Sequence, residues 1–348
     1  MTAPAALSAA DDALLQPATE RAGWQARLDH VVTAPDLADC PPPASPAEEG
    51  VDPDDPRMRY HATMLRVETP AITKAQTLAR RLWLASSPRH EGQLHLALDG
   101  PGETGMSTVL RHIGRLFEGV VRDHLPRDAK RIPVIHINAP LAPGSKLDMS
   151  IPFAEFLGFK HTKDPETASR STDMTGPVCH VMKTRGTRLV LVDGIDRLDN
   201  SELSTAFAYF DYLAAECDVC FVYCGVGARE IVNDARSSKR PAPAGARSGG
   251  IPTLPVLPIP YSPDDHALFH AVAKSFDANL RLHQHQPGDL LKLAEHLHRR
   301  TGGYMKPLAQ LICHSAQEAI ETGLEAITPD LLDSQLVGIF DSDPFQLP

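Results

Sequence analysis

The stretch LHLALDGPGETGMST, residues Leu94–Thr108, has the outline of a phosphate-binding loop between a buried strand and a helix. Such loops follow the pattern G-x-x-x-x-G-K-[ST], and Gly100 and Gly105 keep its glycine spacing. An apolar run precedes the loop and a run with helical spacing follows it, which is the context that this motif requires. Met106, however, occupies the lysine position of the pattern. The stretch therefore predicts the shape of a phosphate site and leaves its chemistry open.

Each part of this loop has an expected role. Backbone N–H groups at the start of a helix bind phosphate oxygens, so the loop itself would hold ATP or ADP. Ser107 would offer a hydroxyl to Mg²⁺, whereas lysine would place a charge between the β- and γ-phosphates. Methionine has a similar length and no charge, so we expect weaker binding and a large loss of catalysis. The predicted phosphate-binding residues are Gly100, Pro101, Gly102, Glu103, Thr104, Gly105, Met106, Ser107 and Thr108.

A second strand, in the segment TRLVLVDGIDRLDN (Thr187–Asn200), ends in Asp193. This is the pattern of a Walker B strand, whose carboxylate holds Mg²⁺ through water. The next position usually carries the glutamate that polarises the attacking water, and here it is Gly194. Asp196 is the candidate substitute, although its geometry would differ. We therefore predict Ser107 and Asp193 as magnesium ligands, and Asp193 and Asp196 as catalytic residues.

Apolar runs alternate with helical patterns from Leu94 onward. Continuous apolar strands are typical of a parallel sheet that helices cover on both faces. The sequence therefore predicts an α/β P-loop nucleotide-binding fold: a three-layer parallel sheet of about five strands with a C-terminal helical lid. The expected strands are Leu94–Leu98, Ile132–Ile137, Arg188–Val192, Val219–Tyr223 and Leu254–Ile259.

Composition shifts suggest where the domains begin and end. The N-terminal region is rich in Ala, Pro and Asp, which predicts a mostly disordered arm with one short helix near 20–32. An amphipathic helix is expected within 69–84, at the start of the α/β domain. The expected regions are the arm at 1–56, the α/β domain at 57–261 with a mobile insertion at 236–250, the lid at 262–335 and a tail at 336–348.

Composition also restricts the class of protein. A net charge of −10 argues against a surface coated for nonspecific nucleic-acid binding. No apolar window is long enough to span a membrane and the N-terminus lacks a signal-peptide pattern, so we expect a cytoplasmic protein without a membrane partner. The six cysteines fit free thiols in that compartment. The C-x-x-C of Cys217 and Cys220 lacks the second ligand pair that a zinc site needs.

Three more segments contain candidate site residues. The apolar run FVYC ends where this fold places a polar sensor, but Cys224, Gly225 and Val226 are poor ligands for a γ-phosphate. Lys306, at the start of a lid helix, either reaches the phosphates or faces solvent. The basic segment Arg236–Arg247 is either a solvated loop or a contact for DNA or a protein partner.

Together these motifs resemble the AAA+ ATPases, and within them the TniB/TnsC-type regulators of transposition. The resemblance covers residues 66–335 and rests on the TPAIT helix, GPGETGMST, LVLVDGID, FVYCGVGARE and the lid run that begins RTGGYMKPLAQ. It implies an ATP-dependent homo-oligomer, a ring or a filament, that assembles on DNA and connects it to a transposase or another protein partner. It also implies that Lys306 is the lid sensor. The arginine-finger candidates are Arg236, Arg240 and Arg247.

Met106, Gly194 and Val226 depart from the family pattern, and all three departures weaken hydrolysis. We therefore expect a TniB/TnsC-like AAA+ regulator, with degenerate Walker A and Walker B motifs, that binds ATP weakly or not at all and acts by assembly with DNA and partners. An active ATPase with a compensating cation from Lys306, Lys146 or a neighbouring subunit's arginine is the first alternative. A STAND-like signalling or defence module is the second.

Overall fold

The computed structural model describes residues 14–42, 55–63, 67–86, 93–126, 128–140, 148–159, 173–237, 250–262, 264 and 266–336. Contacts divide the chain into two compact units, and each is described by itself. The first unit comprises Met1–His30, Ala71–Gly102 and Met106–Val256. The second comprises Val31–Pro70, Glu103–Gly105 and Leu257–Pro348.

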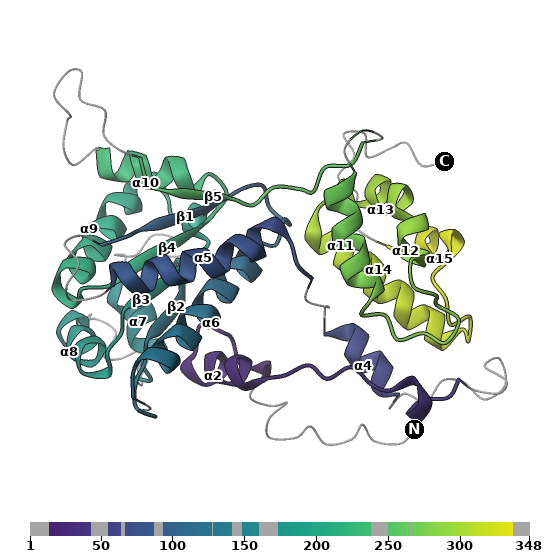
Figure 1. Ribbon diagram of the computed structural model, residues 1–348. Coiled ribbons are helices and arrows are strands. Elements are labelled where there is room, and N and C mark those ends of the chain that lie inside the picture. The colour runs from purple at the N-terminus through teal and green to yellow at the C-terminus, as the bar shows by residue number, and fades with distance from the viewer. Residues whose placement is uncertain are drawn as a thin grey trace, which may run out of the picture. The chain divides into compact units, whose positions relative to one another are not determined.

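The first unit is built on a five-stranded parallel sheet, as the sequence predicts (Figure 1). The strand order is β2-β3-β4-β1-β5, so the chain crosses over between every pair of consecutive strands. Such crossovers in a parallel sheet need helices on its faces. The strands are β1 (Leu96–Asp99), β2 (Val134–Asn138), β3 (Leu189–Asp193), β4 (Cys220–Gly225) and β5 (Thr253–Pro255).

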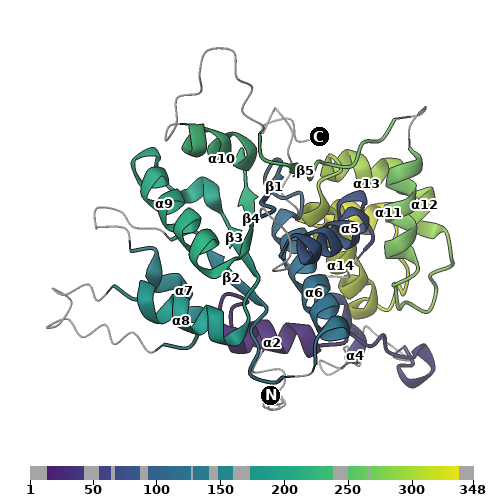
Figure 2. The same ribbon diagram turned by 60° about the vertical axis from the view of Figure 1, so that its left-hand side comes forward.

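Helices cover both faces of this sheet, which gives the expected three layers. Figure 2 shows α7, α8 and α9 on one side of the sheet and α5 and α6 on the other. Because both faces are covered, β4 is buried along its whole length and β3 is buried as far as Val192, before the partly buried Asp193. The helices are α2 (Arg21–Asp29), α5 (Pro70–Ala85), α6 (Met106–His124), α7 (Ser150–Phe156), α8 (Thr175–Arg185), α9 (Asn200–Cys217) and α10 (Ala228–Ser237).

The fifth strand is shorter than predicted. The apolar run suggests a strand over Leu254–Ile259, but β5 ends at Pro255. Pro258 and Pro260 follow, and proline has no N–H to offer a neighbouring strand. Val256 still donates its N–H to the Asp99 carbonyl of β1 at 2.8 Å, and the strand does not continue to Ile259.

The N-terminal region contains more order than its composition suggests. The short helix expected near 20–32 is present as α2, and its Trp24 is buried at 3% exposure. Gly114 on α6 makes room for this ring, because a Cβ at Gly114 would lie 2.7 Å from both Trp24 and Leu191. Residues 1–13 and 43–54 of the expected disordered arm lie outside the described residues.

The second unit is helical, as expected for the lid, but it also includes residues from far upstream. Its core contains large apolar side chains such as Phe269, Phe276 and Leu311. Arg57, on α4, is fully buried and pairs with Asp55 at 2.8 Å and Glu325 at 2.9 Å. The expected boundary at 56/57 therefore differs from the structure. Helices of this unit are α4 (Pro56–Ala62), α11 (Ala267–Asp277), α12 (Asp289–Lys292), α13 (Ala294–Thr301), α14 (Met305–Glu321) and α15 (Pro329–Ser334).

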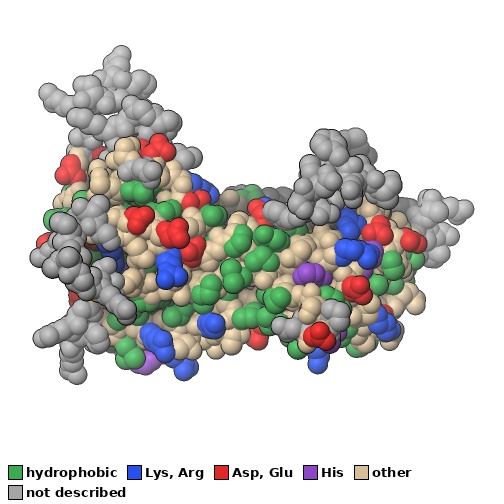
Figure 3. All heavy atoms as spheres, turned by 90° about the horizontal axis from the view of Figure 1, so that it is seen from above, with side chains coloured by type: hydrophobic (Ala, Val, Ile, Leu, Met, Phe, Trp, Pro, Cys, Tyr) green, Lys and Arg blue, Asp and Glu red, His purple; other side chains and the backbone are tan. Residues whose placement is uncertain are grey.

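Among the described residues, no helix is both long and apolar enough to cross a membrane. Figure 3 shows basic, acidic and histidine side chains interspersed with hydrophobic ones on the face that it presents. Of the expected insertion at 236–250, residues 238–249 lie outside the described residues, and so do residues 337–348 of the expected tail.

Candidate nucleotide-binding site

The predicted phosphate loop runs from the end of β1 to the start of α6. Gly105 has φ +87°, a left-handed conformation that favours glycine, and it directly precedes the first helical residue, Met106. Gly100 is required for a different reason: a Cβ there would lie 2.0 Å from the carbonyl oxygen of Val256. A Cβ on Gly102 would meet no heavy atom within 4 Å. The tip of the loop thus has free space where a bound phosphate would approach.

Met106 contributes to the core of the first unit rather than to the loop surface. Its exposure is 9%, and it packs with the apolar residues of α6 and the sheet. A thioether in this environment supplies dispersion contacts and no charge. The position that holds lysine in the phosphate-loop pattern therefore serves packing in this chain.

Ser107 and Asp193 are brought together by α6 and β3. The Ser107 hydroxyl donates a hydrogen bond of 3.0 Å to Oδ1 of Asp193. Both side chains are only partly buried, so their oxygens remain accessible. A hydroxyl and a carboxylate oxygen are ligands that Mg²⁺ prefers. The two residues predicted as magnesium ligands thus form one oxygen-rich pair at the carboxyl end of β3.

Gly194 leaves little room for the missing glutamate. It has φ +72°, and a Cβ there would lie 2.7 Å from Nε of Arg197. A glutamate at this position would need a strained backbone and a displaced arginine. Asp196, the candidate substitute, lies close to the backbone of Gly225, because a Cβ on Gly225 would meet its Oδ1 at 2.2 Å.

The strands on either side of Asp193 present two side chains that are neutral at pH 7. Asp193 is in register with Cys224 on β4 and with Asn138 on β2. Burial raises the pKa of Cys224 well above its usual range, and the charge of Asp193 adds to this effect. Burial also lowers the pKa of His136, on β2, to about 4, against the charge of Asp193.

Sequence analysis did not single out His136. The signal was available, because VIHIN places a polar ring inside an apolar strand, two residues before the strand ends at Asn138. The Nδ1 atom of His136 lies 3.2 Å from the carbonyl oxygen of Ala18, and Nε2 is buried without a partner among the described residues. Its proximity to Asp193 requires knowledge of the strand order.

Lys306 pairs with the loop residue Glu103, and both belong to the second unit. The Lys306 Nζ atom lies 2.8 Å from Oε2 of Glu103, and the Lys306 N–H donates to the Glu103 carbonyl at 3.0 Å. Glu103 has φ +63°, which is uncommon for a residue with a side chain. The charge of Lys306 is thus opposed by a carboxylate of the loop itself.

Of the three arginine-finger candidates, only Arg236 falls within the described residues. Its charge acts on groups inside the first unit: together with burial, which is the larger cause, it lowers the pKa of His95 to about 4. It also opposes the effect of burial, which raises the pKa of Tyr223. Arg236 therefore lies near these two rings, and Arg240 and Arg247 lie outside the described residues.

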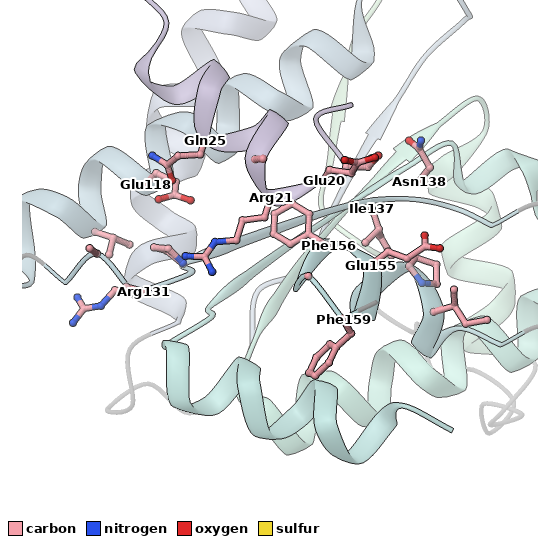
Figure 4. A pocket seen from close by; sticks show the side chains of 18 of the residues that line it. Glu20, Arg21, Gln25, Glu118, Arg131, Ile137, Asn138, Glu155, Phe156 and Phe159 are labelled. Carbon is pink, nitrogen blue, oxygen red and sulfur yellow. The ribbon is translucent and has the colours of Figure 1, made fainter. Parts of the chain in front are cut away.

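A cavity of about 1800 Å³ lies beside β2, apart from the loop (Figure 4). Its walls include Arg21 on α2, Glu118 on α6 and Asn138 at the end of β2. Burial raises the pKa of Glu118 to about 7, although the indole N–H of Trp24 donates to this carboxyl at 3.1 Å. Within the described part of the chain, none of Gly100–Thr108 lines the cavity, so it is not the phosphate site.

Comparisons with solved structures identify the fold. No protein-family model matches the chain, and no curated protein matches its sequence. Among solved structures, Aeropyrum pernix ORC1 in complex with DNA aligns at 16% identity and a TM-score of 0.52, over 78% of this chain and 65% of that one. This chain thus spans less than two thirds of the ORC1 chain.

Two further structures from Thermotoga maritima align less closely. Domain III of the replication initiation protein DnaA has 14% identity and a TM-score of 0.45, over 81% of this chain and 95% of that chain. The RuvB Holliday junction branch migration motor has 13% identity and a TM-score of 0.40, over 76% and 67%. The sheet order and the ORC1 alignment together show that the chain has the fold of the AAA+ ATPases.

Proposed function

We propose that this chain is a TniB/TnsC-like AAA+ regulator that binds ATP or ADP with Mg²⁺ and hydrolyses ATP little or not at all. The observation that carries the proposal is the 3.0 Å hydrogen bond between Ser107 and Asp193. It preserves the metal-binding pair of a phosphate-loop protein. Met106 and Gly194, by contrast, lack the charged groups on which hydrolysis depends. This combination supports a site that binds nucleotide and cleaves it little or not at all.

The residues present fit a magnesium nucleotide. Mg²⁺ is commonly held by one or two protein oxygens, with waters and substrate phosphates completing an octahedron. Ser107 would supply one oxygen directly and Asp193 would act through water. The backbone N–H groups that open α6 would bind phosphate oxygens. The metal would neutralise phosphate charge, which partly offsets the absence of lysine.

At the described end of β3, the positions expected to activate water for hydrolysis do not offer a suitably placed side chain. Gly194 has no side chain, and Asp196 lies against the backbone of Gly225. Cys224, at the sensor position, is a neutral thiol because burial raises its pKa. None of these residues supplies a positive charge that would stabilise the γ-phosphate as it departs. Nucleotide would therefore act as a ligand that favours one assembled state.

Assembly is the second half of the proposal. One structural neighbour, ORC1, was solved in complex with DNA, and we extend DNA binding to this chain as part of the proposed function. Self-association into a ring or filament, in which a transposase or another protein is the partner, would then couple nucleotide binding to DNA. Sedimentation with an ATP analogue and duplex DNA tests this: we expect faster-sedimenting species with both ligands. A monomer under every condition would reject it.

Nucleotide binding is tested by titration with fluorescent mant-ADP, with and without Mg²⁺. We expect saturable binding that Mg²⁺ strengthens, and we expect Asp193→Ala to remove the strengthening. Asp123→Ala, at an exposed position near the end of α6, is the matched control and should bind as the wild type does. Absence of binding, or binding that Mg²⁺ and Asp193→Ala leave unchanged, would reject the proposed site.

A further inference from the structure

Arg111 lies on α6 one helical turn after Ser107. Residues four apart on a helix share one face, so both side chains point toward the same side of the sheet. Long side chains on a helix extend back toward its N-terminus. The Arg111 guanidinium is therefore directed toward the level of Ser107, where Ser107 meets Asp193 at 3.0 Å.

The charge of Arg111 acts on the strands on both sides of Asp193. It contributes, after burial, to the lowered pKa of His136 on β2. On β4 it opposes the effects of burial and of Asp193, which raise the pKa of Cys224. β3, which ends in Asp193, lies between these two strands in the sheet. Arg111 is thus one of the cations on the side of the sheet where Ser107 meets Asp193, with Arg197 close to Gly194 and Arg27 on α2.

Arg111 is also incompletely satisfied. Its side chain is half-buried, and within the described part of the chain no hydrogen bond or ion pair to its guanidinium is found. Arg27, its neighbour on α2, shows the usual arrangement, because it donates to the carbonyl oxygens of Leu14, Gln16 and Gly23. A partly desolvated guanidinium without acceptors is costly unless an anion binds it.

We propose that Arg111 is the phosphate-side cation of the nucleotide site, supplying from inside α6 the charge that Met106 cannot supply from the loop. This inference rests on the proposed nucleotide binding, and its ligands are nucleoside di- and triphosphates. Guanidinium and phosphate form paired hydrogen bonds that lysine does not reproduce. A phosphate oxygen or a metal-bound phosphate is therefore the partner that Arg111 lacks.

The test compares mant-AMP and mant-ADP binding to the wild type, Arg111→Gln, Arg111→Lys and Arg122→Gln. Arg122, exposed on the last turn of α6, is the matched control. We expect Arg111→Gln to weaken mant-ADP binding about tenfold, as for the loss of one charged hydrogen bond. It should weaken mant-AMP binding less, and Arg111→Lys should retain part of the affinity. Arg122→Gln should bind as the wild type does.

The phosphate dependence separates a direct contact from a structural role. A variant that merely loosens the fold would weaken both nucleotides equally, and its thermal midpoint would fall. Equal binding of mant-ADP by Arg111→Gln and the wild type, or equal loss for both nucleotides, would overturn the inference while leaving nucleotide binding intact. A wild type that binds neither nucleotide would reject the proposed function, and the role of Arg111 with it.

Discussion

Two arginines of this molecule occupy opposite surroundings, one in each unit. Arg57, in the helical unit, is fully buried and contacts the carboxylates of Asp55 and Glu325. Arg111, in the α/β unit, is half-buried, and no acceptor for it is found among the described residues. Buried charges are normally paired. We therefore interpret the paired cluster of Arg57, Asp55 and Glu325 as structural, and the surroundings of Arg111, where no acceptor is found, as a place for a ligand. The comparison indicates that a structural charge differs from a binding-site charge in whether it has hydrogen-bond partners, rather than in how deeply it is buried.

The largest expected effect is the loss of stability when the cluster of Arg57, Asp55 and Glu325 is broken. Arg57→Met would leave Glu325, which is 2% exposed, as a buried charge with one partner fewer. We expect a loss of about 3–5 kcal/mol in the free energy of unfolding of the helical unit, as for a broken buried pair. Urea unfolding followed by circular dichroism measures it.

A matched control and a second variant sharpen this result. Lys292→Met breaks a pair with Asp289 in which the lysine is 77% exposed, and we expect little change in the free energy of unfolding because water screens this pair. Adding Glu325→Gln to Arg57→Met should regain part of the lost stability, because the unpaired charge is removed. If Arg57→Met and Lys292→Met have equal effects, the cluster around Arg57 is not structural.

Glu118 gives the second prediction, because it is a partly buried acid whose only described side-chain donor is the Trp24 indole. Burial raises its pKa to about 7, above the value of 4.5 for a free carboxyl. The folded chain then keeps this proton to higher pH than the unfolded chain, so stability falls as pH rises from 4.5 to 7.

Glu118→Gln removes this pH dependence. The variant should match the wild type near pH 4.5 and exceed it by roughly 3 kcal/mol above pH 7. Unfolding curves at several pH values measure the difference. If the stability difference between Glu118→Gln and the wild type stays constant from pH 4.5 to 7, Glu118 does not titrate in this range. The carboxyl would then be less buried than its contacts indicate.

Met106→Lys is expected to have the smallest energetic effect, a change in nucleotide affinity, and it directly tests the proposed phosphate site near Arg111. A lysine at the start of α6 would bring a second cation to the phosphates, and we expect mant-ADP to bind about tenfold more tightly. In the Arg111→Gln background the same change should restore part of the lost affinity. Unchanged binding in both backgrounds would mean that the loop does not hold phosphate.

Much of the α/β unit could be predicted from local patterns. The loop spacing, the apolar strands and Asp193 at a strand end are all short-range features, and the structure confirms the strands and the place of Asp193 at the end of β3. Even the pairing of Ser107 with Asp193 follows from the fold that these motifs predict. The fifth strand was predicted too long because that prediction followed the apolar residues and gave too little weight to the prolines among them.

The remaining features depend on contacts between distant segments. Arg57 and Glu325 are 268 positions apart, and no local pattern indicates that they meet. The packing of Trp24 into the space above Gly114 is equally nonlocal. Arg111 could be placed on the same helix face as Ser107 from spacing alone. Its importance emerges only when His136 and Cys224 are known to flank Asp193.

ATP turnover by the wild type and Asp193→Ala, at saturating ATP and Mg²⁺ and with duplex DNA present, tests the central claim most directly. The account predicts that the wild type binds nucleotide yet releases phosphate no faster than Asp193→Ala does. Steady turnover at an ordinary enzymatic rate, about 1 per second or faster and abolished by Asp193→Ala, would contradict it.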